Sequence, residues 1–163
     1  MEKTLSKALL TVYILILIWL VLFKLQFDLS SIIHRNYRSV NLTPFAYAIK
    51  SDVILNWLFF LPFGVLLNVV YKNTGFITKL LVIIAFSLSA ELLQYIFAIG
   101  VSDITDLITN SLGGLAGLLL YMLFNTFIDD RKLDRFVVTL GIMLLLIFLF
   151  IHGSHYFRRT LFR

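Results

Sequence analysis

The chain contains no cysteine, and charged residues make up only 14% of it. Without cysteine, disulfide bonds and thiolate metal sites are excluded, and the redox compartment stays undetermined. No segment resembles a nucleotide-binding loop, no stretch is of low complexity, and no internal repeat is convincing. We therefore expect a single domain over residues 1–163, with no cofactor and no metal.

Apolar side chains, in contrast, are abundant. Hydrophobic residues make up 60% of the chain, and its mean hydropathy is +0.96. This composition excludes an ordinary soluble core, and a helix that crosses a bilayer needs about 20 apolar residues. The sequence predicts an all-α integral membrane protein, a bundle of about five transmembrane helices. The expected helices cover about residues 5–24, 53–71, 80–101, 106–128 and 134–152.

The net charge of +5 comes from basic residues at the ends of the expected spans. They form no patch interleaved with aromatic residues, so no nucleic-acid partner is expected. Each side of the membrane receives seven Lys and Arg residues, and the totals do not decide the orientation. Short connectors orient spans best, and the connectors 72–79 and 129–135 carry five of these residues. We expect a multi-pass protein of the cell membrane with a cytoplasmic amino terminus.

Glu91 lies in the middle of the uncharged run 80–101. A charged side chain at the centre of a spanning helix costs roughly 2.5 to 3.5 kcal/mol on insertion scales. Such a residue normally faces the interior of a bundle or a wet cavity. The alternative is a protonated carboxyl group that forms hydrogen bonds between helices.

Other polar residues collect on the same side of the membrane as Glu91. At the rise of a helix, Gln94 lies roughly 9 Å deep, Glu91 roughly 13 Å, Asn110 about 12 Å and Asn56 about 6 Å. Gln94 and Asn110 should therefore meet. We predict a polar pocket that opens to one leaflet, formed by Asn56, Glu91, Gln94, Asp103, Asp106 and Asn110.

Each polar residue also has a structural explanation. Asp103 could cap the helix over 106–128, with Asp106 at the third helical position of a capping box. The amide side chains could simply join helices. His152 and His155 are three residues apart but have no accompanying carboxylate, so we interpret them as interfacial residues and not as a metal site.

Three glycines, Gly113, Gly114 and Gly117, continue the face of Asp103, Asp106 and Asn110. Small residues four apart allow transmembrane backbones to approach closely. We expect these glycines to pack the helix over 106–128 against the helix over 80–101.

Four segments of the chain resemble successive motifs of the VanZ-like family, in the family's order and spacing: Arg38–Phe45, Asn56–Gly64, Glu91–Gln94 and Asp103–Gly114. The resemblance covers about residues 38–124 and includes a loop motif with Arg38, Asn41 and Pro44. The flanks resemble family members from glycopeptide-resistance clusters. Family members often carry an arginine before the first aspartate and an acid before the second. This chain has Gly100, Val101 and Ser102 at the former place and Thr105 at the latter.

The resemblance implies low-level resistance to teicoplanin, a lipid-tailed glycopeptide, without implying a known reaction. One hypothesis is a binding protein for the drug or for a lipid-linked cell-wall precursor. A second is an enzyme that modifies a lipid or wall precursor with Glu91 as acid or base. A third is a subunit that contacts another membrane protein. Under all three hypotheses the lipid bilayer surrounds the chain.

Overall fold

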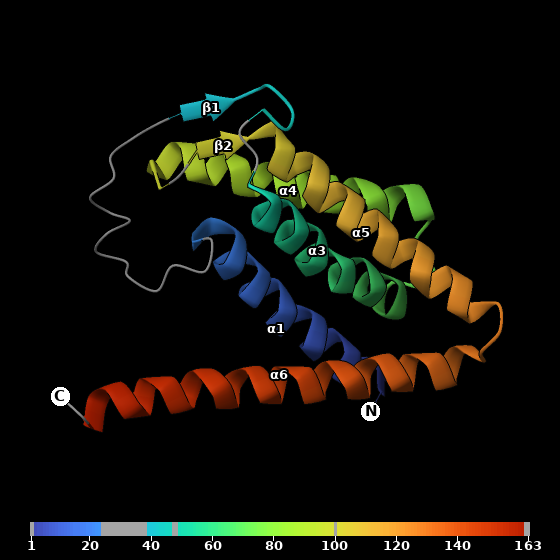
Figure 1. Cartoon of the computed structure of the whole chain (residues 1–163). Coiled ribbons are helices and arrows are strands. Elements are labelled where there is room, and N and C mark those ends of the chain that lie inside the picture. The colour runs from blue at the N-terminus through green and yellow to red at the C-terminus, as the bar shows by residue number, and fades with distance from the viewer. Residues whose placement is uncertain (1, 24–38, 47–48, 100, 162–163) are drawn as a thin grey trace.

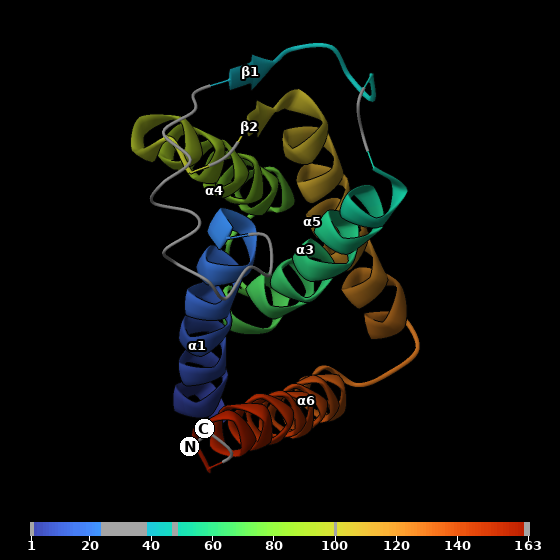
Figure 2. The same ribbon diagram turned by 60° about the vertical axis from the view of Figure 1, so that its left-hand side comes forward.

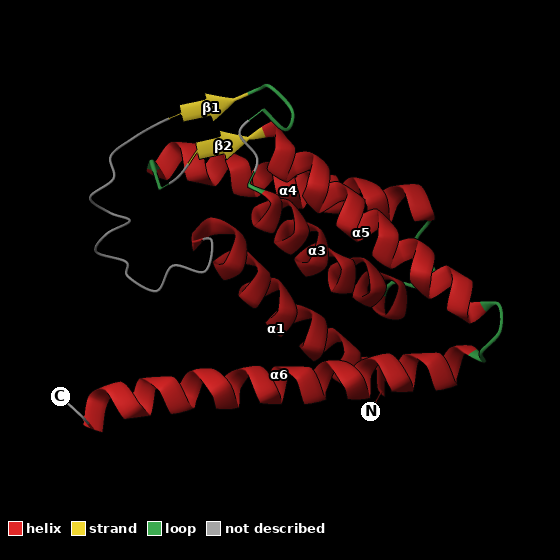
Figure 3. Ribbon diagram, viewed as in Figure 1, coloured by secondary structure: helices red, strands yellow, loops and turns green. Residues whose placement is uncertain are grey.

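The computed structural model describes residues 2–23, 39–46, 49–99 and 101–161, apart from the side chains of residues 2, 23, 148 and 151–161. Nearly all of this part of the chain is helical, which confirms the all-α class (Figure 3). In chain order, the elements are α1 (Glu2–Phe23), β1 (Ser39–Asn41), α3 (Lys50–Val70), α4 (Phe76–Phe97), β2 (Val101–Asp103), α5 (Ile104–Asn125) and α6 (Asp130–Leu161).

Four of these helices are long and apolar enough to cross a membrane. The candidate spans are Lys3–Leu22, Lys50–Val70, Phe76–Phe97 and Ile104–Asn125. The chain is therefore a multi-pass membrane protein. The expected fifth span, residues 134–152, falls within α6, and some of its side chains lie outside the described residues.

The connection between α4 and α5 differs from the tight hairpin that the sequence suggests. α4 ends earlier than expected, at Phe97, where the C-cap Ala98 adopts a left-handed conformation with φ 55°. The chain then forms β2, which pairs in parallel with β1, with Asn41 opposite Asp103 (Figure 1). Because the Ser102 hydroxyl donates to the Glu91 carbonyl oxygen at 2.7 Å, β2 lies beside the last turns of α4. α5 therefore begins level with Glu91.

Helices α3 and α5 run in the same direction and pack closely. A Cβ atom added to Gly113 would overlap the Trp57 carbonyl oxygen, and one on Gly117 would overlap that of Leu61. Gly64 of α3 faces the Gly114 carbonyl oxygen in the same way. The glycines permit this approach because they have no side chain to hold the two backbones apart.

The predicted partner of the three glycines is thus correct for one of them. Gly114 faces α4, where an added Cβ would meet the Ile83 side chain. The prediction is wrong for Gly113 and Gly117, which pack on α3. The reason is that successive glycines on a helix point in different directions, and β2 places α5 between α3 and α4.

The remaining helices complete the bundle around a core of large apolar side chains. Phe60, Phe63 and Phe86 contact one another through their rings, with centroids 5.2 to 6.1 Å apart. α1 packs mainly on α3, and α6 lies at the edge of the bundle away from α4 (Figures 1 and 2). Gly141 of α6 faces Leu9 of α1. The two strands lie together at the end of the bundle where α3 and α5 begin (Figure 1).

The glycine contacts predict a matched pair of variants. Gly117→Ala should destabilise the folded protein by about 1–3 kcal/mol, because the added methyl group must displace the backbone of α3. Gly75→Ala adds the same atom where the nearest neighbour lies at 3.9 Å, and it should have little effect. Unfolding of both variants in detergent tests this. Equal stability of Gly117→Ala and the unmodified chain would contradict the close packing.

The alternation of helices predicts the accessibility of introduced cysteines. Leu42 and Val101, which are exposed and lie in or next to the paired strands, should react with a membrane-impermeant thiol reagent from one side of the membrane. Lys132, which is exposed near the start of α6, should react only from the other side. Reaction of all three positions from a single side of intact cells would refute the arrangement.

Candidate functional site

Seven polar side chains meet where the two strands join α3, α4 and α5. We call them the polar centre: Asn41, Asn56, Glu91, Gln94, Asp103, Asp106 and Asn110. Glu91, Gln94, Asp106 and Asn110 are buried, and the other three are partly buried. The structure therefore gathers all six predicted pocket residues, together with Asn41 of the loop motif, at one end of the bundle.

Glu91 joins α4 to the start of α5. Its Oε2 atom accepts a hydrogen bond from the Asp103 backbone N–H at 2.8 Å. In a capping box, the residue at the third helical position forms this bond to the N-cap N–H. Here Glu91 of another helix forms it instead. Glu91, an acid within a membrane span, therefore satisfies a backbone N–H group at the N-terminus of α5.

Asp103 itself caps α5, as the alternative interpretation of the sequence proposed. Its Oδ1 atom accepts from the Thr105 N–H at 2.8 Å. Its Oδ2 atom accepts from the Asn41 side-chain amide at 3.1 Å. One carboxylate thus caps a helix and also attaches the loop motif before α3.

Asp106, at the third helical position of α5, is left to bind α3. Its Oδ1 atom accepts from the Asn56 side-chain amide at 2.8 Å. On α5 this bond lies about two turns before Gly113, and on α3 it directly precedes Trp57, which Gly113 contacts. Asn56 and Asp106 consequently fix the relative position of α3 and α5 at this end.

Gln94 and Asn110 do not pair with each other as the depth estimate suggested. Gln94 donates to the Val21 carbonyl oxygen of α1 at 2.9 Å, and Asn110 donates to the Ser87 hydroxyl of α4 at 3.0 Å. The estimate assumed a tight hairpin, whereas β2 shifts α5 along α4. Both side-chain oxygens are buried and accept no hydrogen bond from the described residues.

The loop motif folds over the start of α5. The side-chain oxygen of Asn41 accepts from the Thr43 N–H at 3.1 Å, and the turn that follows places Pro44 before Phe45, which has a φ of 60°. Proline at the second position and a positive φ at the third are typical of a type II turn. The Phe45 N–H then donates to the Thr105 hydroxyl at 3.0 Å. Arg38 lies outside the described residues.

The carboxylates of the polar centre act as hydrogen-bond acceptors. Glu91, Asp103 and Asp106 each accept from a neutral N–H group. Within the described ranges, no group of three or more His, Asp or Glu side chains is arranged to hold a metal ion. The side chains of His152 and His155 are outside those ranges. The arrangement suits orientation of a polar group.

An apolar cavity of about 520 Å³ lies between α1, α3 and α6. Its lining includes Leu20 of α1, Phe59 and Pro62 of α3, and Leu144 of α6. Leu20 precedes Val21, which accepts the hydrogen bond from Gln94, and Phe59 lies one turn after Asn56. The cavity is therefore close in sequence to two contacts of the polar centre.

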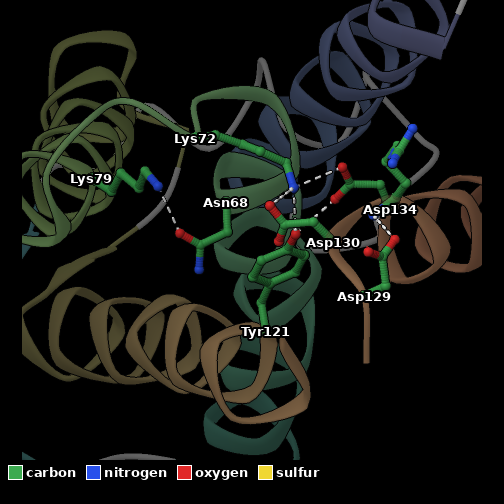
Figure 4. Close-up of polar contacts among 8 residues, drawn as sticks. Asn68, Lys72, Lys79, Tyr121, Asp129, Asp130 and Asp134 are labelled. Carbon is green, nitrogen blue, oxygen red and sulfur yellow. Dashed lines mark hydrogen bonds and ion pairs between the residues drawn. The ribbon is translucent and has the colours of Figure 1, made fainter. Parts of the chain in front are cut away.

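A second polar cluster, at the opposite end of α3 and α5, was missed by the sequence analysis. The Lys72 ammonium group forms ion pairs with Asp134 at 2.8 Å and with Asp130 at 3.3 Å, and it donates to the Tyr121 hydroxyl at 3.0 Å (Figure 4). Burial lowers the pKa of Lys72, but its bonds to Asp134 and Tyr121 outweigh this effect and raise the pKa above the ordinary value. Lys72 therefore stays charged at neutral pH.

Lys79 and Asn68 belong to the same cluster. The Lys79 ammonium group donates to the Asn68 side-chain oxygen at 2.8 Å, and the Asn68 amide donates to the Leu118 carbonyl oxygen at 2.9 Å. From the sequence alone, Lys72 and Lys79 are interpreted only as charges that orient spans. Lys72 follows the end of α3 at Val70, so helical periodicity gives no signal that joins it to Asn68.

Comparisons with known proteins agree with these motifs. A family model described as VanZ/LLP1 matches residues 10–125. Protein VanZ of Enterococcus faecium is 48% identical over 156 residues, which cover 95% of this chain and 96% of that protein. No solved structure matches the chain.

The two roles of Asp103 can be separated by substitution. Asp103→Ala should destabilise the protein by about 1–2 kcal/mol, because α5 loses its cap and Asn41 loses its acceptor. Asp103→Asn should cost clearly less, since asparagine is a competent cap. Unfolding in detergent measures both variants. If the two substitutions have the same effect, capping does not explain the contribution of Asp103.

Proposed function

This chain belongs to the VanZ/LLP1 family, and we propose that it confers low-level resistance to teicoplanin by binding the drug or a lipid-linked cell-wall precursor. The observation that carries the proposal is the identity to protein VanZ over nearly the whole of both chains. It extends across every segment that contributes to the polar centre. The type of resistance is the one that the family motifs imply.

The site that we assign to the ligand combines the polar centre with the apolar cavity. An amphiphile needs an apolar surface for its tail and hydrogen-bonding groups for its head. The cavity between α1, α3 and α6 is lined by aliphatic and aromatic side chains. Val21, which accepts a hydrogen bond from the polar centre, lies next to this cavity along α1. Asn56, a member of the polar centre, lies next to it along α3. A tail in the cavity would thus place the head toward the strands.

Two buried acceptors support a ligand with amide or hydroxyl donors. The side-chain oxygens of Gln94 and Asn110 accept nothing from the described residues. A buried acceptor without a partner costs about 1–3 kcal/mol, and a donor from a ligand or a water molecule removes that cost. Peptide and sugar groups of a glycopeptide, or of a wall precursor, supply such donors.

We further propose that the amino terminus is cytoplasmic, which places the polar centre on the outer side. The basic connectors at the other end of α3 and α5 support this orientation. A drug that arrives from outside, and a precursor displayed in the outer leaflet, would then meet the strands first.

A catalytic role is the second candidate, because the Glu91 carboxylate accepts from the backbone N–H of Asp103, and Asp106 follows one turn later on α5. Carboxylates gathered at the start of one helix could act as acid and base. Formation of a product from isolated lipid precursors by the purified chain would favour the enzyme. A stoichiometric membrane protein that co-purifies would instead favour a subunit of a larger assembly.

The proposal is tested by resistance of a susceptible Gram-positive host that expresses the chain. Tolerance should rise for teicoplanin more than for vancomycin, and more than for a teicoplanin core from which the lipid tail has been removed. Glu91→Ala should abolish the gain, because both the acceptor for the Asp103 N–H and the charge are lost. Glu91→Gln keeps the acceptor, so it separates hydrogen bonding from charge.

Membrane abundance must be measured beside each resistance value. Ser89→Ala is the matched control, since Ser89 lies on the exposed side of α4 and, among the described residues, donates to the Ala85 carbonyl oxygen of its own helix alone. Asp106→Asn, Asn110→Ala and Asn56→Ala extend the series around the polar centre. If all of these variants reach the membrane normally and still protect against teicoplanin, the polar centre is structural and our site assignment is wrong.

A further inference from the structure

Lys79 is a buried cation with an incomplete set of partners. It lies in the first turn of α4, and only 6% of the residue is exposed. Its ammonium group has three N–H donors, of which Asn68 accepts one. No carboxylate of the described residues lies within ion-pair distance of it, because Asp130 and Asp134 both bind Lys72. Burial of an ammonium group without a counter-charge is unfavourable.

The position of Lys79 is built by its neighbours. The Asn68 amide nitrogen donates to the Leu118 carbonyl oxygen. This bond turns the Asn68 amide oxygen toward Lys79, from which it accepts (Figure 4). Both Asn68 and Leu118 are buried. A rigid acceptor at the α3–α5 contact thus holds a charged side chain of α4 in one place.

Lys79 lines a cavity of about 270 Å³ that it shares with Asn68, Lys72, Tyr121 and Asp130. This volume far exceeds the roughly 30 Å³ that one water molecule occupies in the liquid. The cavity is open at its outer edge, where the side chains of Lys72 and Asp130 are 34% and 54% exposed. Lys72 forms ion pairs with both Asp130 and Asp134, so these three side chains add no net positive charge to the cavity, and Lys79 is its cation without an ion pair among the described residues.

The N-terminus of α4 adds further positive potential to the cavity. Thr74 and Phe76 belong to its lining, and the N-cap between them, Gly75, has no side chain that could accept from the first turn. Free N–H groups and the helix dipole favour an anion at such an end. The buried Lys79 ammonium group and a helix N-terminus therefore converge on one space.

The cavity also lies at the level of the lipid headgroups. The spans Lys50–Val70 and Phe76–Phe97 end and begin at the turn that forms its wall. Basic pockets between transmembrane helices on the cytoplasmic side bind anionic headgroups. We infer that this cavity binds the phosphate group of an anionic membrane lipid, with Lys79 as its principal ligand. The inference is independent of the function assigned to the polar centre.

Amine labelling of the unmodified full-length chain tests the site without any substitution. The probe is an acylating reagent, and mass spectrometry compares Lys79 with the exposed Lys132. In nanodiscs that contain phosphatidylglycerol, acylation of Lys79 relative to Lys132 should be several-fold slower than in a detergent micelle free of phospholipid. Equal ratios in the two environments overturn the inference.

Inorganic phosphate distinguishes the two sources of the anion. It is added to the detergent-solubilised chain, with sodium chloride of equal ionic strength as the reference. Protection of Lys79 by the nanodisc lipid but not by inorganic phosphate supports a lipid ligand. Protection by inorganic phosphate alone overturns the assignment to a lipid and leaves a site for free phosphate.

A matched pair of variants measures the contribution of the charge. Lys79→Met keeps the length of the side chain, and Lys132→Met removes one exposed charge outside the cavity. Retention of phosphatidylglycerol in native mass spectrometry should fall about tenfold for Lys79→Met, a factor equivalent to about 1.4 kcal/mol, and stay unchanged for Lys132→Met. Equal retention by both variants contradicts the site. If Lys79→Met does not fold, the labelling experiment decides.

Discussion

The close contact of α3 with α5 is the constraint on which the rest of the structure depends. Gly64, Gly113 and Gly117 bring the two backbones together at a distance that admits no Cβ atom between them. Transmembrane helices gain no hydrophobic driving force from each other in lipid, so this packing and the hydrogen bonds at its two ends must hold them. At one end Asn56 binds Asp106, and at the other Asn68 binds the Leu118 carbonyl oxygen.

A second constraint is that polar groups within the membrane must find partners inside the protein. The polar groups at the N-terminus of α5 find these partners among side chains from two other segments. Glu91 accepts from the Asp103 N–H, and Asn41 donates to the Asp103 carboxylate that caps the helix. The position of the Glu91 carboxylate within a span is thereby explained by its hydrogen bond to the start of α5. The same residues also provide the polar surface that we assign to the ligand.

The two ends of the α3–α5 pair differ in chemistry. At the end with the strands, the three carboxylates of the polar centre accept hydrogen bonds, and its side-chain amides donate them. The other end carries Lys72 and Lys79, of which the former binds two aspartates and the latter an amide oxygen. If the basic end is cytoplasmic, the chain presents acceptors to the outer side and ammonium groups to the anionic inner surface. A drug-facing site and a lipid-anchoring site could then coexist in a chain of 163 residues.

The sequence by itself determined the all-α membrane class and the approximate spans of α1, α3, α4 and α5, and it placed six of the seven residues of the polar centre on one side of the membrane. These follow from local properties: long apolar runs form helices in a bilayer, and polar residues at matched depth on one side of the membrane must turn inward. Only the tertiary structure decided the partners. β2, which pairs with β1 some 60 residues earlier, shifts α5 along α4 and so joins Asn110 to Ser87 and Gln94 to α1. Gly113 and Gly117 turn to α3, and Lys79 becomes buried, because the neighbours of a helical face depend on long-range packing that periodicity does not encode.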